Sequence, residues 1–148
     1  MHRDLSPHEQ KRLAALFTDR IGTYLDAGSG SCCLAESLVA NSVVRALRHF
    51  DGVRYRIFAW CVMPNHVHVV FQPLKDYALS GILHAWKSYT AKDANRLLAR
   101  TGIFWQREYY DHLVRDEDDF HRVVRYVLEN PREAGMHDWP WVGIGAPQ

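Results

Sequence analysis

The sequence is poor in cysteine and contains no long apolar run. Its three cysteines, Cys32, Cys33 and Cys61, form neither a C-x-x-C pair nor an even set, which argues against a disulfide framework and indicates a reduced, cytosolic chain. No stretch approaches the roughly 18 apolar residues that a membrane span needs, and the first residues lack the apolar core of a signal peptide. We therefore expect a cytoplasmic protein with no membrane partner.

An excess of one charge sign is also lacking, since the formal net charge is only +1. Dedicated nucleic-acid-binding domains usually carry a basic excess, so the total charge argues against such a partner. The distribution of the charges argues the other way. Between residues 84 and 107 the only acid is Asp93, and the bases are Lys87, Lys92, Arg96, Arg100 and Arg107. A local basic surface of this kind is compatible with a DNA site.

The composition, 47% hydrophobic and 24% charged over 148 residues, is typical of one globular domain, and there is no repeat or long linker within 1–148. Hydrophobic periodicity predicts an N-terminal helical segment within 1–25, beginning at Ser6. The other predicted elements are a helix over Leu34–Phe50 with Leu38 facing inward, strands over Arg54–Val62 and His66–Gln72, a helix over Leu79–Arg100, an extended segment over Tyr109–Val114, and a helix from Glu117 to Asn130 that stops before Pro131. This order of elements predicts an α+β sandwich, an antiparallel sheet with helices packed on it.

Two histidines stand on the second predicted strand. Residues two apart on a strand point to the same face, so His66 and His68 project together while Val67, Val69 and Phe71 point into the core. Two neutral imidazoles held in this way make half of a divalent-metal site for Mn²⁺, Mg²⁺ or Zn²⁺. The alternative is a polar strand face that holds two histidines without a metal.

The last predicted helix carries a tyrosine away from its apolar stripe. That stripe consists of Phe120, Val123, Val124 and Val127. At about 100° per residue, Tyr126 lies roughly 130° from the centre of the stripe, with Arg122 and Asn130 one turn to either side. A tyrosine beside an amide on a polar face is a candidate nucleophile, and a half-exposed surface tyrosine is the alternative. With a metal to neutralise a phosphate, the weakly nucleophilic phenol can attack phosphorus and form a phosphotyrosine.

The segment C-V-M-P-N-H-V-H-V-V-F at 61–71 resembles the histidine–hydrophobic–histidine strand of the REP-associated tyrosine transposases, relatives of the insertion-sequence-200 transposases. Three later segments follow in the order of that family: WKSYTAKDANRLL at 86–98, GIFWQREYYDHLVRDEDDF at 102–120 and RYVLENPREAGM at 125–136. The resemblance implies that 1–148 is a transposase-like HUH nuclease domain with a ferredoxin-like α+β fold.

The resemblance also implies a chemistry and the residues that perform it. Tyr126 matches the catalytic tyrosine of the family. His66 and His68 match its metal-binding histidines, and Asn130 matches a polar residue that completes the metal shell. The implied cofactor is Mg²⁺ or Mn²⁺. The implied substrate is single-stranded or hairpin DNA, which is cut through a covalent 5′-phosphotyrosine and rejoined.

One departure from the family lies at the start of the chain. Relatives usually begin with a strand before the first helix, and the segment MHRDLSPHEQ at 1–10 does not match one. We therefore expect this first strand to be missing and the edge of the His66–Gln72 strand to be exposed, which favours a homodimer. The same departure favours a competing function, a catalytically weak or inactive module that binds hairpin DNA. A histidine-triad phosphohydrolase is not expected, because Val70 stands where that motif needs a further histidine.

Several basic residues are candidates for DNA contact. Lys92, Arg96 and Arg100 recur every four residues and form a cationic stripe on their predicted helix. Such a stripe either tracks a DNA backbone or is a solvated face. The other predicted DNA contacts are Lys87, Arg107 and Arg122.

Aromatic residues add two further possibilities. Trp105, Tyr109 and Tyr110 either stack on unpaired bases or belong to the core. Tyr89 is a rival nucleophile, although its position near the apolar stripe of its predicted helix favours packing.

Overall fold

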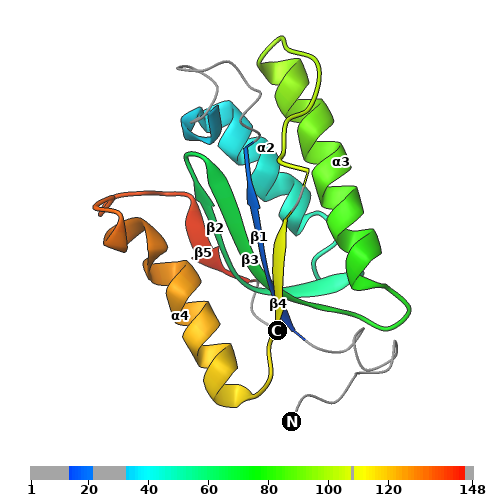
Figure 1. Cartoon of the computed structure of the whole chain (residues 1–148), viewed down its shortest axis with the longest axis vertical. Helices are drawn as coiled ribbons and strands as arrows, with labels where there is room; N and C mark the ends of the chain where they lie inside the picture. Colours follow the sequence, from blue (N-terminus) through cyan, green and yellow to red (C-terminus); the bar gives the residue numbers. More distant parts are fainter. Residues whose placement is uncertain (1–13, 22–32, 108, 146–148) are drawn as a thin grey trace.

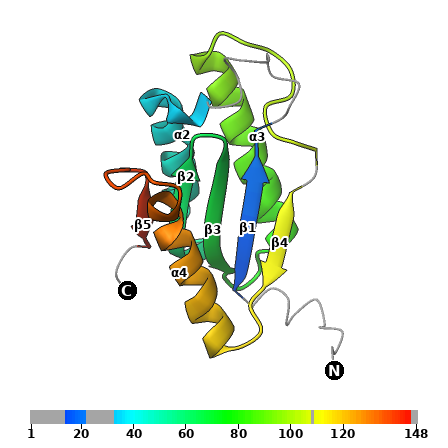
Figure 2. The same cartoon turned by 60° about the vertical axis from the view of Figure 1, so that its left-hand side comes forward.

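The computed structural model describes residues 14–21, 33–107 and 109–145. The elements are β1 (Ala15–Arg20), η1 (Cys33–Ala35), α2 (Ser37–Arg48), β2 (Tyr55–Met63), β3 (His66–Pro73), α3 (Leu79–Leu97), β4 (Tyr110–Leu113), α4 (Glu117–Glu133) and β5 (Val142–Ile144). The strands form one antiparallel sheet in the order β4-β1-β3-β2-β5. Helices α2 and α3 cover one face of the sheet and α4 covers the other (Figure 1 and Figure 2). The order from β1 to β4 is ferredoxin-like, so the predicted α+β sandwich is confirmed.

The described part of the chain contains the strand that the sequence was expected to lack. Residues Ala15–Arg20, predicted as part of a helix, form β1 between β3 and β4. The prediction fails because apolar residues of β1 are buried on both faces, with Phe17 in the cluster toward α2 and α3 and Leu16 in the cluster toward α4. A strand buried on both faces loses its alternating pattern, and its apolar residues then mimic helical spacing. The helix predicted at 6–25 is therefore wrong over residues 14–21, and its other residues lie outside the described ranges.

The same strand covers the edge that was expected to be exposed. β1 pairs with β3 from Ala15 opposite Phe71 to Arg20 opposite His66. The outer strands of the sheet, β4 and β5, have 4 and 3 residues. Short edge strands are a usual protection against edge-to-edge pairing. The prediction of an open edge on β3 is therefore wrong. The homodimer that was expected from that edge loses its support.

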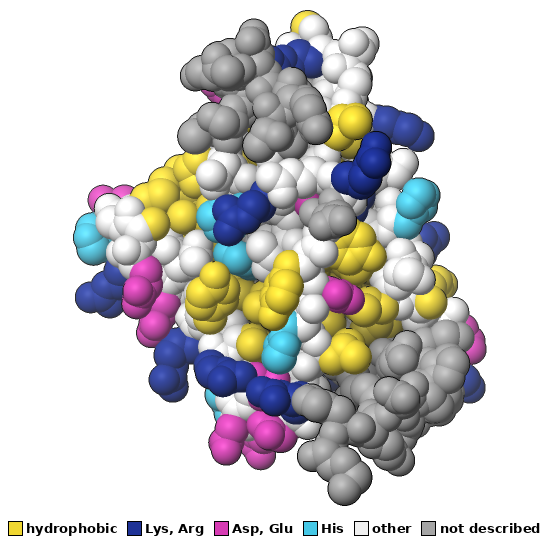
Figure 3. Space-filling model, in the orientation of Figure 1, with side chains coloured by type: hydrophobic (Ala, Val, Ile, Leu, Met, Phe, Trp, Pro, Cys, Tyr) yellow, Lys and Arg dark blue, Asp and Glu magenta, His cyan; other side chains and the backbone are white. Residues whose placement is uncertain are grey.

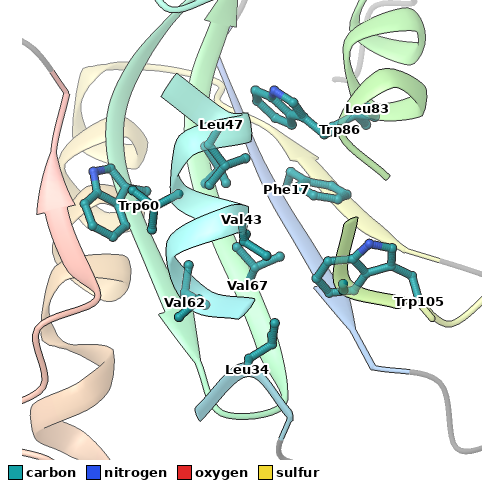
Figure 4. Close-up of a cluster of buried hydrophobic side chains, with 14 of the residues drawn as sticks. Phe17, Leu34, Val43, Leu47, Trp60, Val62, Val67, Leu83, Trp86 and Trp105 are labelled. Atoms are coloured by element: carbon teal, nitrogen blue, oxygen red, sulfur yellow. The ribbon is translucent and has the colours of Figure 1, made fainter. Parts of the chain in front are cut away.

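Two apolar clusters lie on the two sides of the sheet. The larger cluster, drawn in Figure 4, lies against α2 and α3, and its buried residues include Phe17, Val43, Leu47, Val67, Leu83 and Trp86. The smaller cluster lies against α4, and its buried residues include Leu16, Ala59, Val70, Val123 and Val127. The apolar stripe of α4 therefore fixes this helix over the sheet, chiefly on β2 and β3. That position decides where the polar residues of α4 stand.

The other predicted elements agree with the structure to within a few residues, with two exceptions. Leu38 is 69% exposed, because the neighbouring Val39 takes the buried position and Leu38 lies about 100° away around the helix. Helix α4 does not stop before Pro131 but continues to Glu133. A proline inside a helix removes one backbone hydrogen bond, and here the ring is buried. Within the described ranges, every helix is too short or too polar to cross a membrane.

Candidate functional site

The face of the sheet toward α4 carries both histidines of β3. Val67, Val69 and Phe71 lie in the larger cluster on the other face, as predicted. The alternation of the strand therefore directs His66 and His68 toward α4. Their ring centroids lie 4.7 Å apart, and the rings meet edge to face. In the view of Figure 3, histidine side chains reach the surface beside basic and hydrophobic side chains.

His68 is held by a contact from the neighbouring strand. Thr18 is its partner in β1, and Oγ1 of Thr18 lies 2.8 Å from Nδ1 of His68. The other ring nitrogen, Nε2, is buried and has no hydrogen-bond partner among the described residues. A buried polar atom costs free energy unless something binds it. When Nδ1–H donates to Thr18, the Nε2 lone pair is available to a metal ion, which is the usual arrangement of a metal-binding histidine.

His66 is oriented by two amide side chains. Oδ1 of Asn65 lies 2.6 Å from Nδ1 of His66. The side chain of Asn130, on α4, also hydrogen-bonds to His66. Asn130 thus reaches the histidine pair from the opposite layer, one helical turn after Tyr126.

Tyr126 projects from α4 toward the same strand. Its ring centroid lies 5.3 Å from that of His68, and the side chain is 50% exposed. The helix presents the tyrosine here because Val123 and Val127, on either side of it in the sequence, are buried against the sheet. The phenol is therefore next to a candidate metal ligand and also open to a macromolecular substrate.

Burial keeps both imidazoles uncharged at neutral pH. Burial, the neighbouring His66 and the Arg20 guanidinium lower the pKa of His68 to about 3. Burial and Arg20 also lower the pKa of His66, whereas the hydrogen bond that Asn130 accepts from the imidazole raises it. A metal ion needs the free lone pair of a neutral imidazole, so this environment suits metal binding.

The donor atoms at this site are few. Within the described ranges, no group of three or more His, Cys, Asp and Glu side chains could hold a metal ion. A metal here would rest on the imidazoles of His66 and His68 and on the carboxamide oxygen of Asn130. The orphaned Nε2 atom of His68 is the observation that fits such an ion. A mixed nitrogen and oxygen set suits Mn²⁺ better than Mg²⁺, which prefers oxygen ligands.

Arg122, predicted as a DNA contact near Tyr126, forms an ion pair with Asp119, and its side chain is 65% exposed. The Asp119 carboxylate also accepts hydrogen bonds from the backbone amide of Arg115 and from His112. Burial raises the pKa of the Asp119 carboxyl, but these hydrogen bonds outweigh burial and hold it well below its usual range. The guanidinium of Arg122 therefore stabilises the first turns of α4.

The cationic stripe of α3 lies in the layer on the opposite side of the sheet from the histidines. Lys92 and Arg96 are exposed and Arg100 is partly exposed. Arg96 pairs with Asp93, with 2.7 Å between the guanidinium and the carboxylate. Asp93 thus partly neutralises the charge of Arg96. Lys92 and Arg100 are the members of the stripe without an ion pair among the described residues.

Lys87 and Arg107 lie together in one groove on the α3 side of the sheet, with a volume of about 680 Å³. Tyr109 also lines this groove, and Nζ of Lys87 lies 4.8 Å from the centre of its ring. Lys87 forms an ion pair with the buried Asp19, with 3.0 Å between Nζ and Oδ2. Burial nevertheless raises the pKa of Asp19 to about 6.

The remaining aromatic candidates differ in exposure. Trp105 belongs to the core, where its indole N–H donates to Oγ1 of Thr90 at 2.8 Å. Tyr109 and Tyr110 are 40% and 58% exposed. Tyr89 is also 58% exposed, so its expected packing is wrong. Its place on α3 nevertheless puts the sheet between its hydroxyl and the histidine pair.

Thr18 and Arg20 are the site residues that sequence reasoning missed. They lie opposite His68 and His66 in the register of β1 and β3. Both fall in the segment that was predicted as a helix. The sequence offers no clear strand signal here, because Thr18, Asp19 and Arg20 are consecutive polar residues and only the structure shows that Asp19 is buried.

One protein family matches the part of the chain that holds the site. The family described as "Transposase IS200 like" matches residues 41–130, which is more than half of the chain. The match includes both histidines of β3, Tyr126 and Asn130. It ends before the last turn of α4 and does not include β1.

Two bacterial proteins are similar at lower identity. A Haemophilus influenzae protein classed with the REP-associated tyrosine transposases is 29% identical over 102 residues, covering 59% of this chain and 57% of that protein. The REP-associated tyrosine transposase of Escherichia coli K12 is 26% identical over 92 residues, covering 59% of this chain and 53% of that protein. The chain thus spans about half the length of the curated relatives it matches.

Two solved structures share the fold. A REP-associated tyrosine transposase bound to a REP hairpin has a TM-score of 0.65 and 20% identity, covering 96% of this chain and 82% of that chain. A Deinococcus radiodurans R1 protein has a TM-score of 0.54 and 17% identity, covering 80% of this chain and 90% of that chain. At these identities the likeness establishes the fold alone.

Proposed function

We propose that this chain, which belongs to the family of IS200-like transposases, nicks and rejoins single-stranded DNA with Tyr126 as its nucleophile. The observation that carries the proposal is the contact of Tyr126 with His68, at 5.3 Å between ring centroids. It joins the exposed phenol of α4 to the histidine pair of β3. Asn130 adds a second link between the same two elements, through its hydrogen bond to His66.

The proposed reaction is a transesterification at phosphorus. Oη of Tyr126 attacks the scissile phosphate, a phosphorus–Oη bond forms, and the bond from phosphorus to the 3′-oxygen breaks. The proton of the phenol ends on the leaving 3′-oxygen, so the products are a 5′-phosphotyrosine and a free 3′-hydroxyl. Because the covalent link replaces one phosphodiester with another, a 3′-hydroxyl can reverse the step and rejoin strands without a nucleotide cofactor.

The family is generally metal-dependent. In this chain His66, His68 and Asn130 would hold the ion, which when bound would neutralise phosphate charge and polarise the scissile oxygen. Thr18 keeps the His68 ring in place through Nδ1, and burial keeps both imidazoles neutral. The residues of the chain thus prepare the donor atoms before any substrate arrives.

Hairpin DNA is the proposed form of the substrate. One solved relative of the same fold is bound to a REP hairpin, and two curated relatives carry the name of REP-associated transposases. The competing function, a hairpin-binding module without cleavage, is favoured only by the expected absence of a first strand. β1 removes that argument, because it supplies this strand and the Thr18 contact to His68.

The test is a search for the covalent product. The protein is incubated with Mn²⁺ and single-stranded hairpin DNA whose 3′ fragment is labelled, and adducts are separated under denaturing conditions. The parent protein should form a denaturant-resistant adduct, and Tyr126→Phe, which keeps the ring and removes the attacking oxygen, should form none. Tyr110→Phe and Tyr89→Phe are matched controls that should keep it. An adduct that persists in Tyr126→Phe would contradict the assignment, and no adduct in the parent protein would favour the binding module.

A further inference from the structure

Part of the site-bearing face of the sheet is left open beside the histidines. Helix α4 packs chiefly on β2, β3 and β5, so it covers the side of the histidine pair away from β1 and β4. On the other side lie three residues of β1 and β4: Thr18, Arg20 and Tyr110. We call these three residues the β1–β4 strip. Thr18 is partly exposed, and the other two are exposed.

Arg20 gives this strip a positive charge that no acidic side chain of the described residues pairs. It lies directly opposite His66 in the register of β1 and β3, so its side chain is on the same face. Among the described residues, no acidic side chain forms an ion pair with Arg20. Within these ranges the guanidinium is therefore available to an anion, and its fork of donors suits a phosphate.

Tyr110 gives the strip an exposed aromatic surface. It lies opposite Thr18 in the register of β1 and β4, and Thr18 lies opposite His68 on the next strand. Directly opposite residues share a face, so Tyr110 belongs to the same row as His68. Its neighbour two residues on, His112, contacts Asp119 of α4, which confirms that this is the α4 side. The ring is 58% exposed and diagonal to Arg20 across the pair of strands.

We infer that the β1–β4 strip binds one unpaired nucleotide of single-stranded DNA next to the scissile phosphate, with Arg20 on a phosphate and Tyr110 stacked on a base. The inference rests on the proposed function and identifies how the same site receives its substrate. A base in a duplex has both faces covered by its neighbours, whereas an unpaired base offers a free face to an aromatic ring. The strip therefore selects single-stranded over duplex DNA. Arg20 and Tyr110 are positioning residues, since neither takes part in the exchange at phosphorus.

Binding without cleavage tests the inference separately from the proposed function. The intact protein is titrated, with EDTA present, into a short fluorescein-labelled oligodeoxythymidine and into a duplex of the same length, and anisotropy is followed over a range of salt concentrations. Tyr110→Ala should weaken single-strand binding about tenfold or more. Arg20→Gln should weaken it and lower the logarithmic salt dependence by about 0.7. Duplex binding should change little in either variant.

The chain offers a matched control on the opposite side of the sheet. Arg45 and Tyr89 line one pocket between α2 and α3, and Tyr89 has the same 58% exposure as Tyr110. The control variants Arg45→Gln and Tyr89→Ala should bind like the parent protein. The conservative variants Tyr110→Phe and Arg20→Lys should retain stacking and salt dependence, which a loss of fold would not allow.

The outcomes separate the two proposals. Parent-like affinity and salt dependence in Tyr110→Ala and Arg20→Gln would overturn the inference, and so would an equal loss in the control variants. Loss confined to the strip variants supports it, even if the parent protein forms no covalent adduct and the proposed function fails. If the parent protein forms an adduct and the strip variants bind unchanged, the proposed function stands. The proposed role of the β1–β4 strip in binding a nucleotide is then wrong.

Discussion

Oγ1 of Thr18 lies 2.8 Å from Nδ1 of His68 and thereby links the strand β1 to the candidate metal site on β3. The contact leaves the buried Nε2 atom of His68 as the nitrogen that the proposed metal ion would bind. A residue far from the histidine motif thus contacts that motif through a side chain that can hold the orientation of the His68 ring.

Thr18→Val should weaken metal binding without unfolding the protein. Valine has nearly the shape of threonine but cannot hold Nδ1, so the ring of His68 is free to rotate or to change tautomer. We expect the affinity for Mn²⁺, measured by titration calorimetry, to fall about 10- to 100-fold. Thr18→Ser should keep most of the affinity, since it keeps the hydroxyl. The exposed Thr101 provides a matched control, and equal affinities in Thr18→Val and Thr101→Val would show that the contact is incidental.

Removal of either histidine should stop cleavage and spare DNA binding. His66→Ala and His68→Ala each delete one imidazole from the donor set, whereas the proposed DNA contacts lie on other residues. We expect no Mn²⁺-dependent nicking of a single-stranded hairpin in either variant, with hairpin affinity close to that of the parent protein. His84→Ala, an exposed histidine on α3, should nick normally. Full activity in either β3 variant would remove that residue from the site.

The cationic stripe of α3 should contribute unequally to DNA binding. Arg96 is paired with Asp93, so Lys92 and Arg100 are expected to make most of the contacts. The double variant Lys92→Glu/Arg100→Glu should lower the logarithmic salt dependence of single-strand binding by about 0.7 for each lost phosphate contact. Arg96→Glu alone should change it less. If all three reversals leave affinity and salt dependence unchanged, the stripe is a solvated face.

Asp19 should make the protein less stable as the pH rises. Its pKa in the folded protein, about 6, lies above the ordinary value of 3.8, so the folded state holds the proton more tightly than the unfolded state. The stability that the protonated Asp19 contributes is therefore fully present below about pH 4 and is lost as the pH rises toward 6 and above. Asp19→Asn removes this ionisation. The difference in the free energy of unfolding, variant minus parent, should therefore rise by about 2 kcal/mol between roughly pH 4.5 and pH 7.5.

Urea unfolding of the two proteins at both pH values measures this shift. The comparison between variants cancels the titration of other groups to first order, including the histidines. Lys87, whose ammonium lies 3.0 Å from the Asp19 carboxylate, opposes the effect of burial without abolishing it. A difference that does not change with pH would mean that the Asp19–Lys87 pair offsets the burial of the carboxylate completely.

Local periodicity by itself determines much of the candidate site. His66 and His68 share a face because side chains alternate along a strand, and Asn130 follows Tyr126 by one turn because a helix has 3.6 residues per turn. The resemblance of segment 61–71 to a known family then assigns roles to these residues. Such relations need only a few consecutive residues, and they hold whatever the rest of the chain does.

The tertiary structure alone decided which elements meet. The sequence of β1 predicts a helix because burial on both faces removes the alternation of a strand, and Thr18 and Arg20 are missed with it. The contact between Thr18 and His68 joins residues 50 positions apart, and no local pattern encodes such a pairing. The docking of α4 on one face and of α3 on the other likewise follows from two separate apolar clusters. It brings Tyr126 to the histidines and puts the sheet between them and the stripe of α3, because packing acts through space and periodicity only along the chain.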